Sequence, residues 1–317
     1  MTSVLVIGGS GFVGQHLIRT LKQRGIAITV LNRGHNRVAG VQQVIADRTS
    51  ASDMRAAAAQ TGQVDIVIDT SSYTDLHTRL AWEAFAPLAG RWVHLSSAAV
   101  YLPARDAPPR EDSATGGAPV WGEYGREKSA ADMFLLGQTG REPVFIVRPP
   151  YLYGPGNDND RESFVWSRLL ARKPVVVPGE GQTPIQFLHV EDLAHLLAAL
   201  ALGPRRRHAV YNAAGGDAVS LKQWVSMCAA AADRAGQIWT SGDIAENIQA
   251  RTYFPFRDYP CVVNCDRLAE LDDWKPQYSL AEGLAQTYSH YDPVDPVQSA
   301  VEIELVERLA GRRGNEQ

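Results

Sequence analysis

The feature that most constrains this chain is a glycine-rich loop between a short apolar run and a helical stretch. Residues 4–7 (Val-Leu-Val-Ile) indicate a buried strand, and glycines follow at Gly8, Gly11 and Gly14. In this spacing the first glycine permits a tight turn, the second lets a pyrophosphate approach, and the third allows close helix–strand packing. The helix N-terminus then offers unpaired N–H groups to the phosphates. The loop predicts a dinucleotide site, to which we assign Gly8, Ser10, Gly11, Phe12, Val13 and Gly14.

Strand and helix patterns alternate through the first half of the chain. Short runs rich in Val and Ile indicate buried parallel strands at 4–7, 26–31, 44–45, 66–68, 92–95 and 144–147. Helices are expected between them at 13–24, 52–60, 74–86 and 124–137. This alternation predicts right-handed βαβ units, and therefore an α/β fold with a Rossmann-type, doubly wound parallel sheet.

The composition of the chain changes after residue 148, where Pro and Gly become frequent. A length of 317 residues also exceeds what one hydrophobic core usually supports. We expect a dinucleotide-binding domain and a smaller, mixed C-terminal substrate lobe. Their expected ranges are 1–150 with 187–214 for the first, 151–186 with 215–310 for the second, and 311–317 for a frayed tail.

Composition narrows the classes of partner. A formal net charge of −4 gives no general attraction to nucleic acid or anionic membranes. The three cysteines fit neither a disulfide framework nor zinc-site spacing, so no metal is expected. We see no signal-peptide pattern and no apolar run of the roughly 20 residues that span a bilayer. These observations favour a cytoplasmic protein with a small-molecule partner, and they leave a homodimer possible.

The residues after the second and third strands bear on the choice of dinucleotide. An acidic residue that would hold a ribose 2′-hydroxyl is absent after residue 31, where Asn32 and Arg33 stand. Asn32 can still bond a hydroxyl, and Arg33 could pair with a 2′-phosphate or be an exposed loop cation. The pair favours NADP, with NAD possible. Asp47 and Arg48 follow the third strand, where a carboxylate could accept the adenine amino group.

A tyrosine and a lysine lie four residues apart on a helical stretch, at Tyr124 and Lys128, so both project from one face. A phenol with an unperturbed pKa of about 10 is a poor base near neutrality. An ammonium group beside it stabilises the phenolate. Such a pair can donate a proton to a carbonyl oxygen while hydride arrives, or remove one from an alcohol, and the lysine can also bond the cofactor ribose.

These motifs together resemble the extended short-chain dehydrogenase/reductases, the NAD(P)-dependent epimerase/dehydratase family. The resemblance covers nearly the whole chain and is carried by the glycine loop, 96–101 (Ser-Ser-Ala-Ala-Val-Tyr), Tyr124-x-x-x-Lys128, 148–156, 187–194 and 274–276. It implies Tyr124 as acid/base, Lys128 as its partner, and Ser97, four residues before Tyr101, as the serine that also holds the substrate oxygen. We add Thr70, Ser71 and Tyr151 to the expected cofactor contacts.

Departures from the family pattern narrow the reaction. Dehydratases and decarboxylases of this group carry acidic residues where this chain has Ala98 and Ala99. A 4,6-dehydratase is therefore not expected, and an epimerase or reductase acting on a nucleotide sugar or similar compound is. Family members often have Asn at the position of Tyr151, and an Arg-Asp pair where this chain has Ile185 and Gln186. On the substrate side we name Ser97, Tyr73, Gln186 and Arg257, although Tyr73 could equally pack there.

Three further segments resemble one branch of the family, the chloroplast stem-loop-binding proteins and their bacterial relatives. The segments are 154–157, 178–182 and 254–257. Some members of that branch are associated with RNA. Two alternatives to an enzyme therefore stay open, namely a nucleic-acid-binding protein and a redox-sensing regulator, each retaining the dinucleotide site.

Overall fold

The structure is a computed structural model that describes residues 2–104, 107–138 and 143–315. The chain divides into two compact units. Unit 1 comprises Met1–Leu152, Leu188–Ala214 and Val263–Gln277, and unit 2 comprises Tyr153–Phe187, Gly215–Val262 and Tyr278–Gln317. The segment Val263–Gln277, which the sequence placed in the substrate lobe, thus belongs to unit 1.

Unit 1 is built on a parallel seven-stranded sheet in the order β11-β6-β5-β4-β1-β2-β3. The strands are β1 (Ser3–Ile7), β2 (Ala27–Asn32), β3 (Gln42–Ile45), β4 (Ile66–Asp69), β5 (Trp92–Leu95), β6 (Val144–Arg148) and β11 (Val210–Asn212). The chain order reverses between β1 and β4. This is the doubly wound, Rossmann-type topology expected from the alternating pattern, and the predicted fold class is confirmed.

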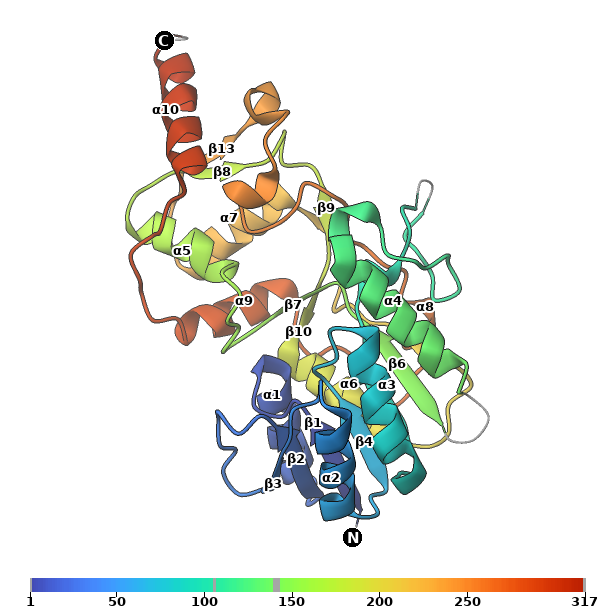
Figure 1. Cartoon of the computed structure of the whole chain (residues 1–317). Coiled ribbons are helices and arrows are strands. Elements are labelled where there is room, and N and C mark those ends of the chain that lie inside the picture. The colour runs from blue at the N-terminus through green and yellow to red at the C-terminus, as the bar shows by residue number, and fades with distance from the viewer. Residues whose placement is uncertain (1, 105–106, 139–142, 316–317) are drawn as a thin grey trace. The chain divides into compact units, whose positions relative to one another are not determined.

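Helices cover both faces of this sheet (Figure 1). The main ones are α1 (Phe12–Gln23), α2 (Ala51–Thr61), α3 (Asp75–Phe85), α4 (Gly122–Leu136) and α6 (Val190–Leu202), with a short α8 (Asp266–Ala269). Strand residues alternate between the two faces: Val4 and Val6 pack in a core with α1 and α6, whereas Leu5 and Ile7 pack in a second core with α2, α3 and α4. A fully covered parallel sheet explains why its strands are continuous apolar runs.

Short 3-10 turns lie along the chain between α3 and α4. They are η1 (Ala86–Leu88), η2 (Ala98–Val100) and η3 (Pro119–Trp121). The strands β7 (Tyr151–Tyr153) and β10 (Phe187–His189) pair with each other. η2 directly follows the loop after β5 and η3 precedes α4, so both bear on how α4 is placed.

Unit 2 contains four helices and two small strand pairs among its described residues. The helices are α5 (Glu162–Leu170), α7 (Leu221–Ala231), α9 (Leu280–Ser289) and α10 (Ala300–Asn315). The pairs join β8 (Val175–Val177) to β13 (Ile238–Thr240) and β9 (Pro184–Ile185) to β12 (Val219–Ser220), with turns η4 (Gly242–Ala245) and η5 (Ala250–Thr252). Capping boxes begin α7 and α9, since Ser220 pairs with Gln223 and Ser279 with Glu282.

The core of unit 2 is aromatic, with Phe187 stacked on Trp224 at 6.1 Å between ring centroids and Phe256 edge-on to Trp224 at 4.7 Å. A buried ion pair fixes the start of α10, because Arg168 Nη2 lies 2.6 Å from Glu302 Oε2. The helix continues through 311–315, where the sequence led us to expect a frayed tail. Residues 316–317 of that tail lie outside the described residues.

Candidate functional site

The residues singled out in unit 1 gather at one edge of its sheet. The glycine loop follows β1, Asn32 and Arg33 lie at the end of β2, and Asp47 and Arg48 follow β3. Three further groups follow the next strands: Thr70, Ser71 and Tyr73 after β4, Ser97 after β5, and Tyr151 after β6. The carboxyl edge of an open parallel sheet, at the point where strand order reverses, is where such folds bind ligands.

The three spaced glycines have distinct steric roles. Gly8 has a φ of +93°, and a Cβ there would lie 2.4 Å from Ser71 Cβ. A Cβ on Gly14 would lie 2.3 Å from the Gly8 carbonyl oxygen, so only glycine allows α1 to pack this closely. At Gly11, in contrast, the one described atom within reach of a Cβ is Gly8 O, at 4.0 Å. Gly11 therefore faces open space beside the helix N-terminus.

Among the described residues, no side chain at the start of α1 would compete with an anionic ligand for its backbone N–H groups. Gly11 is its extended N-cap residue, no side chain among the described residues caps the turn, and the first turn carries no acidic residue. Ser10 is fixed by its carbonyl, which accepts a 3.0 Å hydrogen bond from Gln15 Nε2, and the Phe12 ring packs edge-on to His16. Val13 packs against the apolar core. This open turn fits the phosphates of a dinucleotide.

Asn32 organises the loop that carries Arg33. Its buried side-chain oxygen accepts hydrogen bonds from Gly34 N at 2.9 Å and Gln43 Nε2 at 2.7 Å. Its amide nitrogen donates to Asn36 O at 3.2 Å. Arg33 itself is exposed, and its charge helps to lower the pKa of Asp47, after the hydrogen bonds from Thr49. Asn32 thus shapes the loop, and Arg33 presents a cation at its surface.

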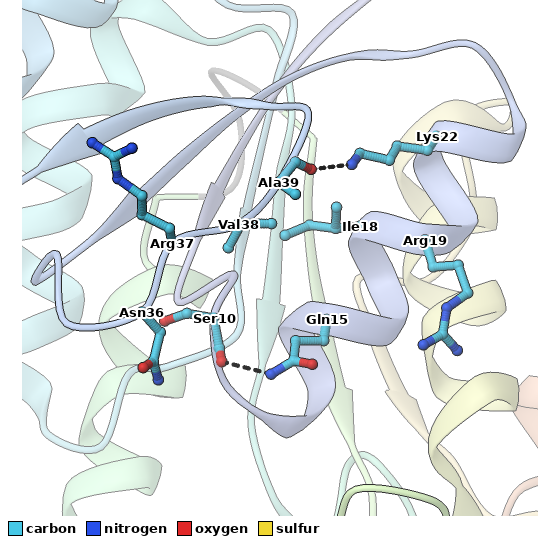
Figure 2. A pocket seen from close by; sticks show the side chains of 9 residues that line it. All are labelled: Ser10, Gln15, Ile18, Arg19, Lys22, Asn36, Arg37, Val38 and Ala39. Atoms are coloured by element: carbon cyan, nitrogen blue, oxygen red, sulfur yellow. Dashed lines mark hydrogen bonds between the residues drawn. The ribbon is translucent and has the colours of Figure 1, made fainter.

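A pocket of about 350 Å³ lies between α1 and residues 36–39 of the same loop (Figure 2). The side chains of Ile18 and Val38 point toward each other across it, whereas the guanidinium groups of Arg19 and Arg37 point outward. Lys22 Nζ donates a hydrogen bond to Ala39 O at its rim. Sequence reasoning did not find this pocket, because its two walls meet only when the loop folds back on α1.

Arg48 is held inside the protein rather than presented to a ligand. Its guanidinium bonds both Asp69 carboxylate oxygens, at 2.9 and 2.8 Å, and donates to Ser71 Oγ at 2.7 Å. Burial raises the pKa of Asp69, but the charge and the hydrogen bonds of Arg48, together with smaller contributions from His94 and Ser71, lower the pKa to about 2. The neighbouring Asp47 carboxylate accepts bonds from Thr49 N and Oγ1, at 2.9 and 2.8 Å.

The segment after β4 is tied to the end of β1. Thr70 Oγ1 donates to Ile7 O at 3.1 Å, and Ser71 is held by Arg48. Tyr73 projects from this segment with 63% of its surface exposed. Thr70 and Ser71 therefore lie next to Gly8, whereas Tyr73 is exposed at the surface.

Two glycines place the helix that carries Tyr124. A Cβ on Gly125 would lie 2.7 Å from Ala99 O, and a Cβ on Gly117, whose φ is +78°, would lie 2.4 Å from Gly125 C. α4 therefore packs directly on the η2 turn that follows β5. Neither glycine belongs to a motif predicted from the sequence, because their contact is between segments rather than within one.

Tyr124 and Lys128 lie one turn apart on α4 but differ sharply in exposure. Tyr124 is 40% exposed, whereas Lys128 is 4% exposed. The Lys128 ammonium donates to Leu95 O at 2.6 Å and to Ser72 O at 2.7 Å, which leaves one of its three N–H donors. Burial lowers the pKa of Lys128 to about 8, against the opposing charges of Asp132 and Asp69.

The serines after β5 have different surroundings. Ser97 is half-buried, and its hydroxyl accepts a 3.2 Å hydrogen bond from Ala99 N at the start of η2. Ser96 is buried and interacts with the Asp132 carboxyl group. Ala98 and Ala99 are 9% and 3% exposed, in the turn against which α4 packs. The more accessible Ser97 suits contact with a ligand.

Two residues of the family motifs hold the structure together. Arg148 Nε donates to Asp132 Oδ2 at 2.8 Å, and Arg148 Nη1 donates to the Tyr101 hydroxyl at 3.0 Å. The Tyr101 hydroxyl donates in turn to Asn212 Oδ1 at 2.6 Å. Tyr151 is buried, with its ring edge-on to Trp121. Arg148 and Tyr101 thus join α4, β6 and β11 beneath the edge.

The two remaining predicted substrate residues belong to unit 2. Gln186 is buried and donates to Gly216 O at 2.6 Å, and Arg257 is half-buried. Across the residues that the structure describes, no group of three or more His, Cys, Asp or Glu side chains is placed to hold a metal ion. No helix in the same part of the chain is both long enough and apolar enough to cross a membrane.

Comparison with known proteins identifies the class. Residues 4–214 match the model of the NAD dependent epimerase/dehydratase family, which is two thirds of the chain. The chain belongs to this family, and the predicted resemblance is confirmed.

Among curated proteins, the chain is 25% identical over 303 residues to the chloroplast stem-loop binding protein of 41 kDa b of Arabidopsis thaliana, covering 90% of this chain and 78% of the relative. It is 27% identical over 323 residues to a dTDP-4-dehydro-6-deoxy-D-allose reductase of Streptomyces bikiniensis, covering 90% and 94%. Both relatives are thus matched over most of their length.

Solved structures agree on the fold. The dTDP-glucose 4,6-dehydratase of Bacillus anthracis, in complex with NAD, superposes with a TM-score of 0.75 at 18% identity, over 92% of this chain and 96% of that chain. The UDP-glucose 4-epimerase of Thermotoga maritima, with UDP-glucose, gives a TM-score of 0.76 at 15% identity, over 91% and 98%.

Proposed function

We propose that this protein is an NAD(P)-dependent reductase or epimerase that transfers hydride on a nucleotide sugar or a similar carbonyl or hydroxyl compound. The observation that carries the proposal is the pair on α4: a buried Lys128 held by two carbonyls, one turn from an accessible Tyr124, on the same strand-end edge as the glycine loop. Family membership supports the same reading.

Each residue of the pair has a defined task. Tyr124 donates its hydroxyl proton to the substrate carbonyl oxygen in reduction and takes the proton from the substrate hydroxyl in oxidation. The Lys128 ammonium stabilises the phenolate, and the accessible Ser97 hydroxyl bonds the same substrate oxygen. When bound, the nicotinamide ring supplies or accepts the hydride.

The glycine loop and its neighbours would hold the dinucleotide, with the pyrophosphate at the start of α1. We keep the full set named from the sequence: Gly8, Ser10, Gly11, Phe12, Val13, Gly14, Asn32, Arg33, Asp47, Arg48, Thr70, Ser71, Tyr124, Lys128 and Tyr151. Within it, Asn32 and Arg48 act by shaping the loops around the ligand. The exposed Arg33 supports NADP over NAD, since a guanidinium pairs well with a 2′-phosphate.

The reaction proposed is not a dehydration. Ala98 and Ala99 supply no carboxyl group for elimination in the turn beneath Tyr124. A nucleotide-sugar substrate is supported by the sequence relatives, which include the Streptomyces dTDP-sugar reductase and a UDP-glucose 4-epimerase of Vibrio cholerae. Tyr73, Gln186 and Arg257 stay our candidates for substrate contact. A cytoplasmic location and a homodimer stay predictions.

Replacing Tyr124 by Phe tests the proposal. The variant lacks only the hydroxyl, so we expect hydride transfer to fall at least about a thousandfold while cofactor affinity changes less than about twofold. Activity is followed as NADPH oxidation with dTDP-4-keto-6-deoxyglucose as the probe, and affinity by calorimetry. Full activity in Tyr124→Phe would overturn the assignment. Met133→Leu on the exposed face of α4 is the control.

A second candidate function, binding of stem-loop RNA on a retained dinucleotide site, is favoured by the Arabidopsis relative. It predicts a salt-dependent gel shift with a stem-loop RNA that persists in Tyr124→Phe. The net charge of −4 disfavours RNA binding, because nucleic-acid-binding proteins usually carry a basic surface. A redox-sensing regulator would instead bind NADP and NADPH with different affinities and turn over no sugar nucleotide.

A further inference from the structure

Lys128 is buried in unit 1 near two ion pairs whose carboxylates the catalytic assignment does not use. The pairs are Arg48–Asp69 and Asp132–Arg148, with N–O distances of 2.8 Å in each. The two carboxylates are 0% and 1% exposed in their side chains.

The two carboxylates are not equivalent toward the ammonium. Arg48 donates hydrogen bonds to both carboxylate oxygens of Asp69, so the guanidinium already compensates much of the Asp69 charge. Asp132 receives one oxygen contact from Arg148 Nε, at Oδ2, and its Oδ1 lies 4.0 Å from His94 Nε2. Among the charges that oppose burial and raise the pKa of Lys128, that of Asp132 is the largest, followed by that of Asp69, while Arg48 lowers it.

His94, on β5, completes the surroundings of the ammonium. Its side chain is fully buried, and neither ring nitrogen has a hydrogen-bond partner among the described residues. Burial, then the Lys128 charge, lower the pKa of His94 to about 3. The ring is therefore neutral at physiological pH and adds no cation beside Lys128.

We infer that Asp132 is a positioning residue for Lys128. Its carboxylate keeps the buried ammonium charged, and through Lys128 it sets the pH range in which Tyr124 exchanges its proton. Two backbone carbonyls orient an ammonium group but carry no net charge, so the compensating charge has to come from a carboxylate. Asp132 lies one helical turn beyond Lys128, on the buried side of α4. This inference rests on the proposed function, because it assigns Asp132 its role through Tyr124.

The test is an ultraviolet titration of Tyr124, taken as the difference between each protein and the same protein carrying Tyr124→Phe. In Asp132→Asn, Lys128 loses its charge at lower pH, so the phenolate loses its cation and Tyr124 should titrate higher by about one pH unit. A carboxylate that acted on Tyr124 directly would give the opposite sign, because its removal eases ionisation. No shift, or a downward shift, would overturn the inference.

Two further variants sharpen the result. Asp112→Asn removes an exposed carboxylate, 72% accessible in its side chain, and should leave the titration unchanged. In a Lys128→Met background, Asp132→Asn should produce no further upward shift. If Asp132→Asn alone does not fold, Asp132→Asn with Arg148→Gln removes both members of the pair. An upward shift is still expected, because Arg148 is not among the charges that shift the pKa of Lys128.

These measurements separate the inference from the proposed function. The titration uses no substrate, so an upward shift establishes that Asp132 acts on Tyr124 through Lys128 even if Tyr124→Phe keeps full activity. In that case the proposed function fails and the electrostatic link stands. Loss of activity in Tyr124→Phe with an unchanged titration in Asp132→Asn gives the reverse outcome, in which the proposed function stands and this inference falls.

Discussion

The loop after β1 and the helix α4 reach the carboxyl edge of the same sheet, yet different forces hold them there. The loop depends on missing side chains: a Cβ on Gly8 or Gly14 would strike neighbouring atoms at 2.4 or 2.3 Å. The α4 side depends on buried charged side chains, namely Lys128, Asp132 and Arg148, with exposed fractions of 4%, 1% and 1%. In the function that we propose, the loop binds through backbone N–H groups, and the α4 side acts through side chains in a low-dielectric setting.

This difference indicates which substitutions each of the two regions tolerates least. Steric requirements at a glycine are local, so a single methyl group disturbs the loop. Buried charges depend on partners contributed by other elements, so removing one partner leaves an uncompensated charge behind. Substitutions in the loop should therefore impair ligand binding and packing. Substitutions among the buried charges beside α4 should instead change stability and pH dependence.

Arg48→Leu should have the largest effect on stability. It leaves the Asp69 carboxylate buried without its partner, and we expect the free energy of unfolding to fall by about 3 to 5 kcal/mol. Denaturant unfolding measures this loss. Arg308→Leu is the matched control, because its pair with Glu304 is 48% and 68% exposed and should contribute under about 1 kcal/mol. Equal losses in the two variants would contradict a special role for buried charge.

Gly14→Ala should have the next largest effect. The added Cβ meets backbone atoms that cannot move without shifting α1, and we expect a loss of about 1 to 3 kcal/mol together with weakened dinucleotide binding. Gly11→Ala is its counterpart: the site has room for a Cβ, so stability should change by under about 0.5 kcal/mol while dinucleotide affinity falls. Equal destabilisation by both would break the steric account of the loop.

Arg33→Ala should have the smallest effect, confined to the choice of cofactor. Losing a charge-assisted contact with the 2′-phosphate should weaken NADP binding about tenfold and leave NAD binding nearly unchanged. Calorimetry with each dinucleotide measures both. Arg37→Ala, on the same loop, should change the preference for NADP over NAD less, since the Arg37 guanidinium points away from the pocket in Figure 2. An NADP-selective loss at Arg37 instead would place the 2′-phosphate beside Arg37 and contradict its assignment to Arg33.

Much of the fold followed from the sequence because its signals act over a few residues. The apolar run before Gly8 and the Val-Ile runs at 66–68 and 92–95 each indicated a strand, and the structure places strands there. The four-residue spacing of Tyr124 and Lys128 put both on one helix. The roles of Asn32 and Arg48 did not follow, because their partners are fixed by the path of the loop and by the neighbouring strand.

The sequence by itself determined the dinucleotide loop, the alternation of strands and helices, and the family, since glycine spacing and periodicity are written in adjacent residues. Only the tertiary structure decided what surrounds Lys128. Asp69 and Arg148 come from strands β4 and β6, and Asp132 acts only because α4 turns that face inward. Burial and long-range pairing depend on the order of strands in the sheet, and that order is a property of the whole chain.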